Sequence, residues 1–203
     1  MSTNKKLYYV YDPMCAWCWG YKPTWNKIEQ SVSDKVEVIY VLGGLAPDSD
    51  VPMPLEMRQA IESYWHKIHE FLGTQFNHDF WTLNTPRRST YPACRATLAA
   101  RYQGNEKEMY FAIQRAYYLN ALNPSDIDTL IQLAEELNLD KEKFKNDFLS
   151  EQTHSELLNE ISFARSIGGN SFPSLFVEVD GRITELPINY QDPEETISQI
   201  ESI

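Results

Sequence analysis

The chain has 203 residues, of which 42% are hydrophobic and 13% aromatic, and these fractions are typical of a globular protein rather than a disordered one. Its length is enough for one domain, or for one domain with a substantial insertion. The formal net charge of −11 at pH 7 argues against binding to nucleic acid or to anionic membrane surfaces, because like charges repel.

The cysteine count and the N-terminal residues bear on the compartment. Three cysteines do not form the even set that a secreted disulfide framework needs. Lys5 and Lys6 precede only five apolar residues, fewer than the ~7–15 of a secretory signal. No run approaches the ~18 apolar residues of a membrane span. We therefore expect a soluble, cytoplasmic protein that begins at its own Met1.

The first part of the chain has a β-α-β pattern. Leu7–Tyr11 is short, apolar and followed by Asp-Pro, which predicts a buried strand. A helix is predicted from about Cys18 to Val32, with a kink at Pro23, because proline removes a backbone hydrogen bond. Val36–Leu42 predicts a second strand, parallel to the first.

The middle of the chain is predicted to be helical. Helix-spaced apolar residues from Met57 to Phe71 predict a long helix that ends at Gly73. Residues 76–89 lack clear periodicity and are interpreted as a loop. Further helices are predicted at residues 91–103, after Asn105, after Ser125, and at residues 141–148 and 153–167, with Thr90, Asn105 and Ser125 as candidate N-caps.

The last part of the chain has a β-β-α pattern. Leu175–Val179 and Arg182–Leu186 predict a hairpin around Asp180-Gly181, and residues 193–203 predict a closing helix. The whole pattern indicates an α/β fold in which one sheet is built from both ends of the chain. We predict that residues 1–45 and 168–203 form this domain and that residues 46–167 form a helical insertion.

The motif Cys15-Ala16-Trp17-Cys18 lies between the first strand and the first helix. Thiols at positions i and i+3 of a first helical turn are close enough to form a small disulfide loop, and the helix dipole favours a thiolate at its N-terminus. This placement predicts that Cys15 attacks a substrate disulfide and that the more buried Cys18 resolves the mixed disulfide.

Two other interpretations of the motif are buried apolar cysteines and half of a zinc site. Zinc would need two more ligands of suitable spacing, and the chain offers no second C-x-x-C. The remaining candidates are Cys94 and the scattered His66, His69, His78 and His154. We interpret Cys94 as a small buried residue and the pair His66 and His69 as helix-surface residues, and we predict no metal site.

The chain resembles the DsbA-like thioredoxin-fold oxidoreductases, and within them the cytosolic FrnE-type disulfide isomerases. The residues that carry the resemblance are Asp12–Gly20 and Ser171–Val177, and the pattern covers essentially the whole chain. The resemblance implies a thioredoxin-like fold with a helical insertion, a cis Pro173 beside the dithiol, and Pro23 as the helix kink. It also implies thiol–disulfide exchange with protein or peptide disulfides, without a metal or an organic cofactor.

The chain departs from this family in two ways. Thioredoxin and periplasmic DsbA place a buried acid in the strand before the motif, whereas Leu7–Tyr11 has no carboxylate and Asp12 is the nearest acid. The proton acceptor is therefore left open. The Ala16-Trp17 dipeptide matches neither Gly-Pro nor Pro-His, so the reduction potential is left open as well.

A sister branch of the fold suggests another activity. Asn84-Thr85 and Ala93–Ala96 resemble kappa-class glutathione transferases and hydroxychromene carboxylate isomerases, which carry serine in place of Cys15 and lack the second cysteine. A glutathione-dependent transferase or isomerase is therefore one alternative, and a partner-binding module without enzymatic activity is another. The two thiols favour disulfide exchange.

Four apolar residues near the dithiol are candidate substrate contacts: Met14, Trp17, Trp19 and Phe172. A surface of this kind can hold an extended peptide through backbone pairing and apolar contact. Glutathione is a further candidate partner, and Arg87-Arg88 could bind its carboxylate, although a solvated loop pair is the simpler interpretation. The sequence does not indicate an oligomeric state.

Overall fold

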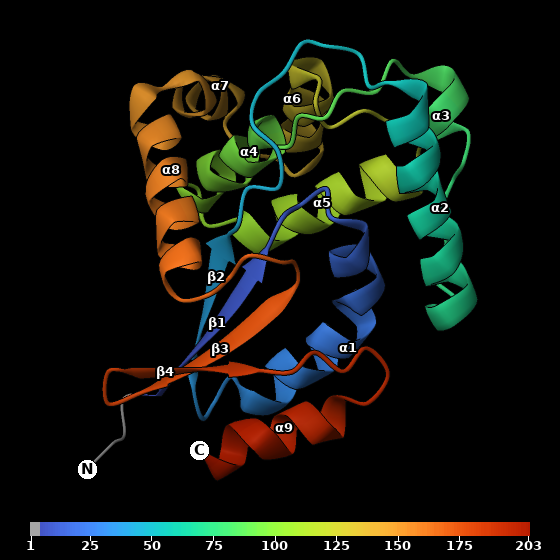
Figure 1. The fold of residues 1–203 in the computed structure, drawn as a ribbon. Helices are drawn as coiled ribbons and strands as arrows, with labels where there is room; N and C mark the ends of the chain where they lie inside the picture. Colours follow the sequence, from blue (N-terminus) through green and yellow to red (C-terminus); the bar gives the residue numbers. More distant parts are fainter. Residues whose placement is uncertain (1–4) are drawn as a thin grey trace.

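A computed structural model describes residues 5–203 of the chain (Figure 1). Its secondary-structure elements follow the predicted order. They are β1 (Lys5–Tyr11), α1 (Ala16–Val32), β2 (Glu37–Leu42), α2 (Leu55–Leu72), α3 (Phe80–Leu83), α4 (Tyr91–Arg101), α5 (Glu106–Tyr118), α6 (Ile127–Glu136), α7 (Lys141–Leu149), α8 (Glu151–Ser166), β3 (Ser174–Val179), β4 (Arg182–Leu186) and α9 (Pro193–Ser202).

One sheet joins the two ends of the chain, in the strand order β2-β1-β3-β4. β1 pairs with β2 in parallel and with β3 antiparallel, so that Tyr8 lies opposite both Ile39 and Phe176. β3 and β4 form the predicted hairpin, whose turn residues Asp180 and Gly181 have φ values of 52° and 80°. The predicted thioredoxin-like α/β arrangement is confirmed.

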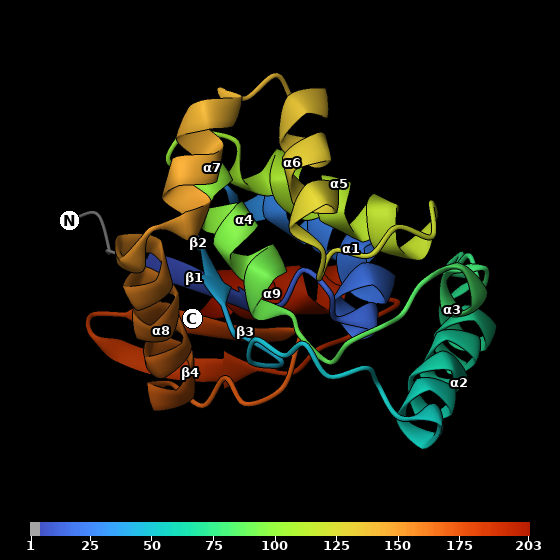
Figure 2. The same ribbon diagram turned by 90° about the horizontal axis from the view of Figure 1, so that it is seen from above.

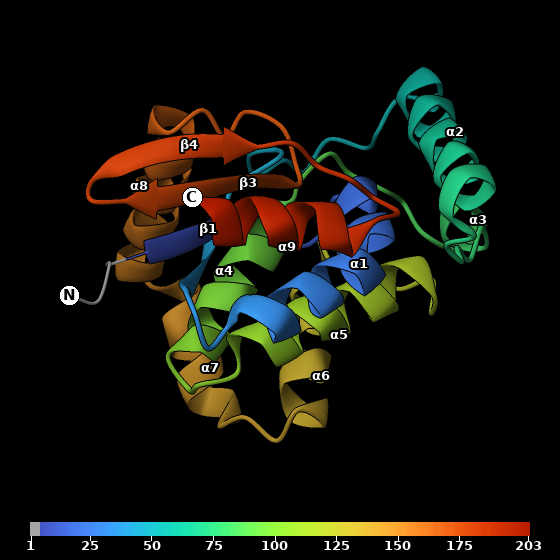
Figure 3. The same ribbon diagram turned by 90° about the horizontal axis from the view of Figure 1, so that it is seen from below.

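Alternating residues of β1 face opposite layers of helices. Leu7, Tyr9 and Tyr11 pack in a core with α1 and α9, which run together along one face of the sheet (Figure 3). Tyr8 and Val10 pack on the other face, with side chains of α8. Because α1 packs against this face, its N-terminus lies at the end of β1, and the dithiol lies there with it.

A second hydrophobic core lies among helices α2 to α7, and α2 and α3 lie at one side of the molecule (Figure 2). The division into residues 1–45, 46–167 and 168–203 stays a prediction. α8 belongs to the predicted insertion in sequence but covers the sheet in space. Among residues 5–203, no helix is both long and apolar enough to cross a membrane.

The structure corrects several local predictions. The short helix α3 lies inside residues 76–89, which were predicted to be a loop, because Phe80 and Trp81 turn inward onto the helical core. None of the three candidate N-caps bonds its helix through its side chain. Thr90 donates instead to Asp12, Ser125 donates to the Ser89 carbonyl, and Asn105 donates to the Gln103 carbonyl.

Candidate active site

The dithiol lies at the junction of β1 and α1. Cys15 is the N-cap residue of α1, with extended backbone angles, and Cys18 lies in the first helical turn. The two cysteines come within 3.5 Å of each other. Cys15 is 6% exposed and Cys18 is fully buried, so Cys15 is the thiol of this pair that solvent or a substrate can reach.

Burial also changes the acidity of Cys18. It raises the pKa of Cys18 well above its ordinary value, and the hydrogen bond and charge of Cys15 raise it further. The Cys15 amide donates to the Asp12 carbonyl over 3.0 Å, which fixes the turn into the helix. Cys18 is therefore held as a thiol beneath Cys15.

The loop before β3 reaches the dithiol. The Phe172-Pro173 peptide bond is cis, as the resemblance implied, and Pro173 is buried. The Cys15 thiol donates a hydrogen bond to the Phe172 carbonyl, with 3.4 Å between Sγ and O. Residues 157 positions apart in sequence thus meet at one thiol.

Arg165 and Gly43, which the sequence analysis did not single out, contact this loop. The Arg165 guanidinium lies over the Phe172 ring, 5.3 Å from its centroid, and donates to the carbonyls of Gly43 and Gly169. The Phe172 ring lies so close to Gly43 that a Cβ there would stand 1.9 Å from Cε1. Gly43, directly after β2, therefore makes room for the Phe172 ring.

Asp12 is fully buried beside the motif and accepts four hydrogen bonds. The amides of Met14 and Leu45 donate over 2.8 and 2.7 Å, the Thr90 hydroxyl over 2.7 Å, and the Cys94 thiol over 3.5 Å. Burial raises the pKa of this carboxyl, and the hydrogen bonds oppose the rise. Cys94 is buried, in agreement with its interpretation, and serves as a donor to Asp12.

Two of the predicted contact residues are committed to the helical core. Met14 is 8% exposed, and its carbonyl accepts a hydrogen bond from the Tyr118 hydroxyl over 2.7 Å. The Trp19 indole stacks on the Tyr118 ring and donates to the Gln75 carbonyl over 3.0 Å. These contacts join the start of α1 to α5 and to the segment after α2.

The other two predicted contact residues, Trp17 and Phe172, are half-buried, as Trp19 is. The Trp17 ring packs against Tyr190 with 5.2 Å between centroids, and Phe172 lies against Arg165 as described above. A groove of about 700 Å³ starts at Trp19 and passes between α1, the end of α2 and the loop that carries Tyr190. Trp17 thus contacts a residue that lines this groove.

The core beneath the dithiol is aromatic and contains residues of β1, α1 and α5. Tyr9 of β1 stacks on Trp25 at 4.3 Å between centroids, and its hydroxyl shares a hydrogen bond of 3.1 Å with the Tyr110 hydroxyl. Burial raises the pKa of both tyrosines well above the ordinary value. The carboxyl nearest to the motif in sequence, that of Asp12, is held on the side toward α4.

The residues that suggested a glutathione enzyme bond within the chain. Asn84 donates to the carbonyls of Phe80 and Ala121. Arg95 forms a bidentate pair with Asp48, and Arg87 pairs with Asp126. Their polar groups hold loops of the helical region.

Comparisons with known proteins identify a family and similar folds. A family model described as thioredoxin matches residues 8–196. The fold is similar to that of a candidate protein disulfide isomerase from Nitrosomonas europaea, with 28% identity, a TM-score of 0.84, and 98% of this chain and 96% of that chain covered. It is also similar to the cytosolic disulfide reductase DsbM from Pseudomonas aeruginosa, with 24% identity, a TM-score of 0.81 and 97% of each chain covered.

Curated relatives have a different description. The chain is 25% identical over 174 residues to the ClpXP adapter protein SpxH of Bacillus subtilis, covering 84% of this chain and 57% of SpxH. It is 26% identical over 151 residues to SpxH of Halalkalibacterium halodurans, covering 71% and 49%. The chain thus spans about half the length of the curated relatives it matches. The family model, which matches residues 8–196, shows that the protein belongs to the thioredoxin family, and the similar structures show that its fold is DsbA-like.

Proposed function

We propose that the protein is a thiol–disulfide oxidoreductase or isomerase that acts on protein or peptide disulfides. The observation that carries this proposal is the paired environment of the two thiols. One lies at a helix N-terminus with some exposure, the other is buried within 3.5 Å of it, and the loop at Phe172-Pro173 contacts the first. The similarity to a disulfide isomerase and a disulfide reductase supports the same chemistry.

The reaction follows from these positions. The Cys15 thiolate attacks one sulfur of a substrate disulfide, the S–S bond breaks, and the second substrate sulfur leaves as a thiolate. Cys18 then loses its proton and attacks the Cys15 sulfur, which releases the first substrate thiol and leaves a Cys15–Cys18 disulfide. The substrate has gained two electrons, and a dithiol or glutathione must return them to the protein. In isomerisation, a substrate thiol attacks the mixed disulfide instead.

Substrate contact is proposed for the predicted surface around Cys15. Trp17 and Phe172 offer half-buried rings beside the thiol, while Met14 and Trp19 shape the surface from the helical core. Pro173 adjoins the Phe172 carbonyl, which lies where a substrate backbone could pair in strand fashion. The groove lined by Tyr190 extends this surface. Separately, we propose that the protein is cytoplasmic, because the reductase DsbM of similar fold is described as cytosolic.

A second candidate function is partner binding without catalysis, because the curated relatives are adapter proteins. Insulin reduction and the refolding of a scrambled disulfide protein separate the two. An oxidoreductase is expected to accelerate both reactions in the presence of glutathione, at catalytic concentrations. Acceleration of neither reaction, despite a reduced and folded protein, would favour the adapter function.

The two motif cysteines are expected to differ in reactivity. Because burial raises the pKa of Cys18 and excludes reagents, iodoacetamide at pH 7 should alkylate Cys15 at least about tenfold faster than Cys18. Peptide mass spectrometry after timed quenching gives the two rates, and Cys94 serves as a fully buried reference. Equal rates for Cys15 and Cys18 in the folded protein would contradict their assigned roles.

A further inference from the structure

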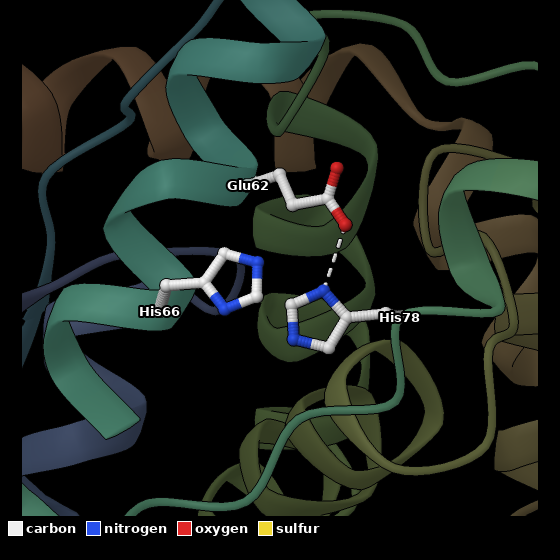
Figure 4. Close-up of side chains that lie close together, drawn as sticks. All are labelled: Glu62, His66 and His78. Atoms are coloured by element: carbon white, nitrogen blue, oxygen red, sulfur yellow. Dashed lines mark hydrogen bonds and ion pairs between the residues drawn. The ribbon is translucent and has the colours of Figure 1, made fainter. Parts of the chain in front are cut away.

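Three potential metal ligands meet far from the dithiol in sequence. Glu62 and His66 lie four residues apart on α2, and therefore on one face of the helix, and His78 approaches them from the segment before α3 (Figure 4). Their ligand atoms all lie within 4.8 Å of one another. His78 Nδ1 is 2.8 Å from the Glu62 carboxylate, and the two imidazole rings stack with 4.5 Å between centroids.

The segment that carries His78 is fixed in place. The Asn77 amide donates to the Tyr118 carbonyl over 2.6 Å, and the Asn77 side chain donates to the Leu119 carbonyl over 3.1 Å. The His78 ring also packs edge-on against Trp65, which is fully buried. Because these contacts order the loop without a ligand, little conformational entropy is lost when His78 binds one.

We propose that Glu62, His66 and His78 form a binding site for a divalent late transition metal, with Zn²⁺ as the first choice. Two imidazoles and one carboxylate suit Zn²⁺, and they do not suit Mg²⁺ or Ca²⁺, which prefer oxygen ligands. Tetrahedral ligands at about 2.0–2.2 Å from zinc stand about 3.3–3.6 Å apart. Metal binding therefore requires rotation of the exposed His66 and of the half-buried Glu62 and His78 side chains to reach this spacing, and water takes the fourth position.

The sequence analysis considered His66 with His69, three residues along α2, and interpreted both as helix-surface residues, and both are exposed in the structure. The structure turns His69 toward the end of the helix, where its Nδ1 lies 2.9 Å from the Thr74 carbonyl. His78 takes the place beside His66 because the chain reverses after α2, which no spacing in the sequence reveals.

A bound ion at this site would link α2 to the segment before α3. These elements lie together at one side of the molecule in two views (Figures 2 and 3). The C-terminal residues of α2, Phe71 and Leu72, line the groove that begins at Trp19. The metal is therefore expected to stabilise one wall of that groove, without taking part in thiol chemistry.

The test uses the full chain with its dithiol oxidised by diamide, so that Cys15 and Cys18 offer no thiolate to the metal. Zn²⁺ affinity is measured by competition with a chromophoric chelator, and Co²⁺ binding by its visible absorption. His66→Ala and His78→Ala are each expected to weaken Zn²⁺ binding about tenfold or more and to remove the tetrahedral Co²⁺ bands. His69→Ala, on the same helix, is the matched control and should bind like the unaltered protein.

Melting temperatures separate loss of a ligand from loss of fold. Zn²⁺ should raise the melting temperature of the unaltered protein and of His69→Ala, but not of His66→Ala, even where the metal-free proteins melt alike. Equal Zn²⁺ affinity in all of these proteins, or no saturable binding, would overturn the proposal and leave only a Glu62–His78 ion pair. That outcome would not touch the proposed disulfide exchange, which is measured without added metal.

Discussion

Replacement of Cys15 by serine is expected to abolish insulin reduction and disulfide refolding, with a rate at least about a thousandfold below that of the unaltered protein. A serine hydroxyl does not ionise near neutral pH and cannot form a mixed disulfide. The substitution is nearly isosteric, and the new hydroxyl can still donate to the Phe172 carbonyl, so the fold is expected to persist. Timed insulin-reduction assays check the loss of activity, and far-ultraviolet circular dichroism checks that the fold persists.

Two further cysteine variants sharpen this result. Cys94→Ser keeps a donor for Asp12 and should retain most of the activity, which makes it the matched control for loss of a thiol. Cys18→Ala should accumulate mixed disulfides through Cys15, because no buried thiol then resolves them. A glutathione transferase that uses Cys15 alone would keep its turnover in Cys18→Ala. Full activity of Cys15→Ser would end the proposal of disulfide exchange.

Local patterns were enough to predict the sheet and the dithiol. Leu7–Tyr11 and Leu175–Val179 are short apolar runs bounded by turn residues, and the structure pairs them as neighbours in one sheet. The cysteine spacing at a strand–helix junction is likewise a property of four consecutive residues. The cis Phe172-Pro173 bond was predicted only because the surrounding residues resemble a known family.

The remaining parts of the site depend on contacts between distant segments. Thr90 lies 78 residues from Asp12, and Cys94 lies 82 residues from it, so no periodicity links them. Threonine often caps helices, so Thr90 was predicted to cap α4 through its side chain. Its hydroxyl donates instead to the buried Asp12 carboxylate, because a hydrogen bond to a charged group stabilises more than one to a backbone amide. The role of Arg165 could not be predicted for the same reason, because in the sequence it is one charged residue near the end of a predicted helix.

Asp12 is the residue whose removal is expected to cost the most stability. It ties the turn after β1 to the segment after β2 and to the start of α4, through Met14, Leu45 and Thr90. Asp12→Ala leaves the buried Met14 amide and the part-buried Leu45 amide without this acceptor, and each unpaired buried group costs about 1–3 kcal/mol. We expect a loss of about 3 kcal/mol in the free energy of unfolding, measured by urea titration under reducing conditions. A loss below about 1 kcal/mol would show that these amides find other acceptors.

The pH dependence of stability reports on the same carboxyl. Burial raises the pKa of Asp12 in the folded state above its unfolded value, so the folded protein binds this proton more tightly. The part of the stability that comes from binding this proton is therefore complete below the ordinary aspartate pKa and is lost as pH rises through the raised value. Asp12→Asn has no proton to lose, and Glu160, whose pKa burial also raises, is present in both proteins. The free energy of unfolding of the unaltered protein should thus fall relative to that of Asp12→Asn as pH rises through this window, and parallel curves would contradict a raised pKa for Asp12.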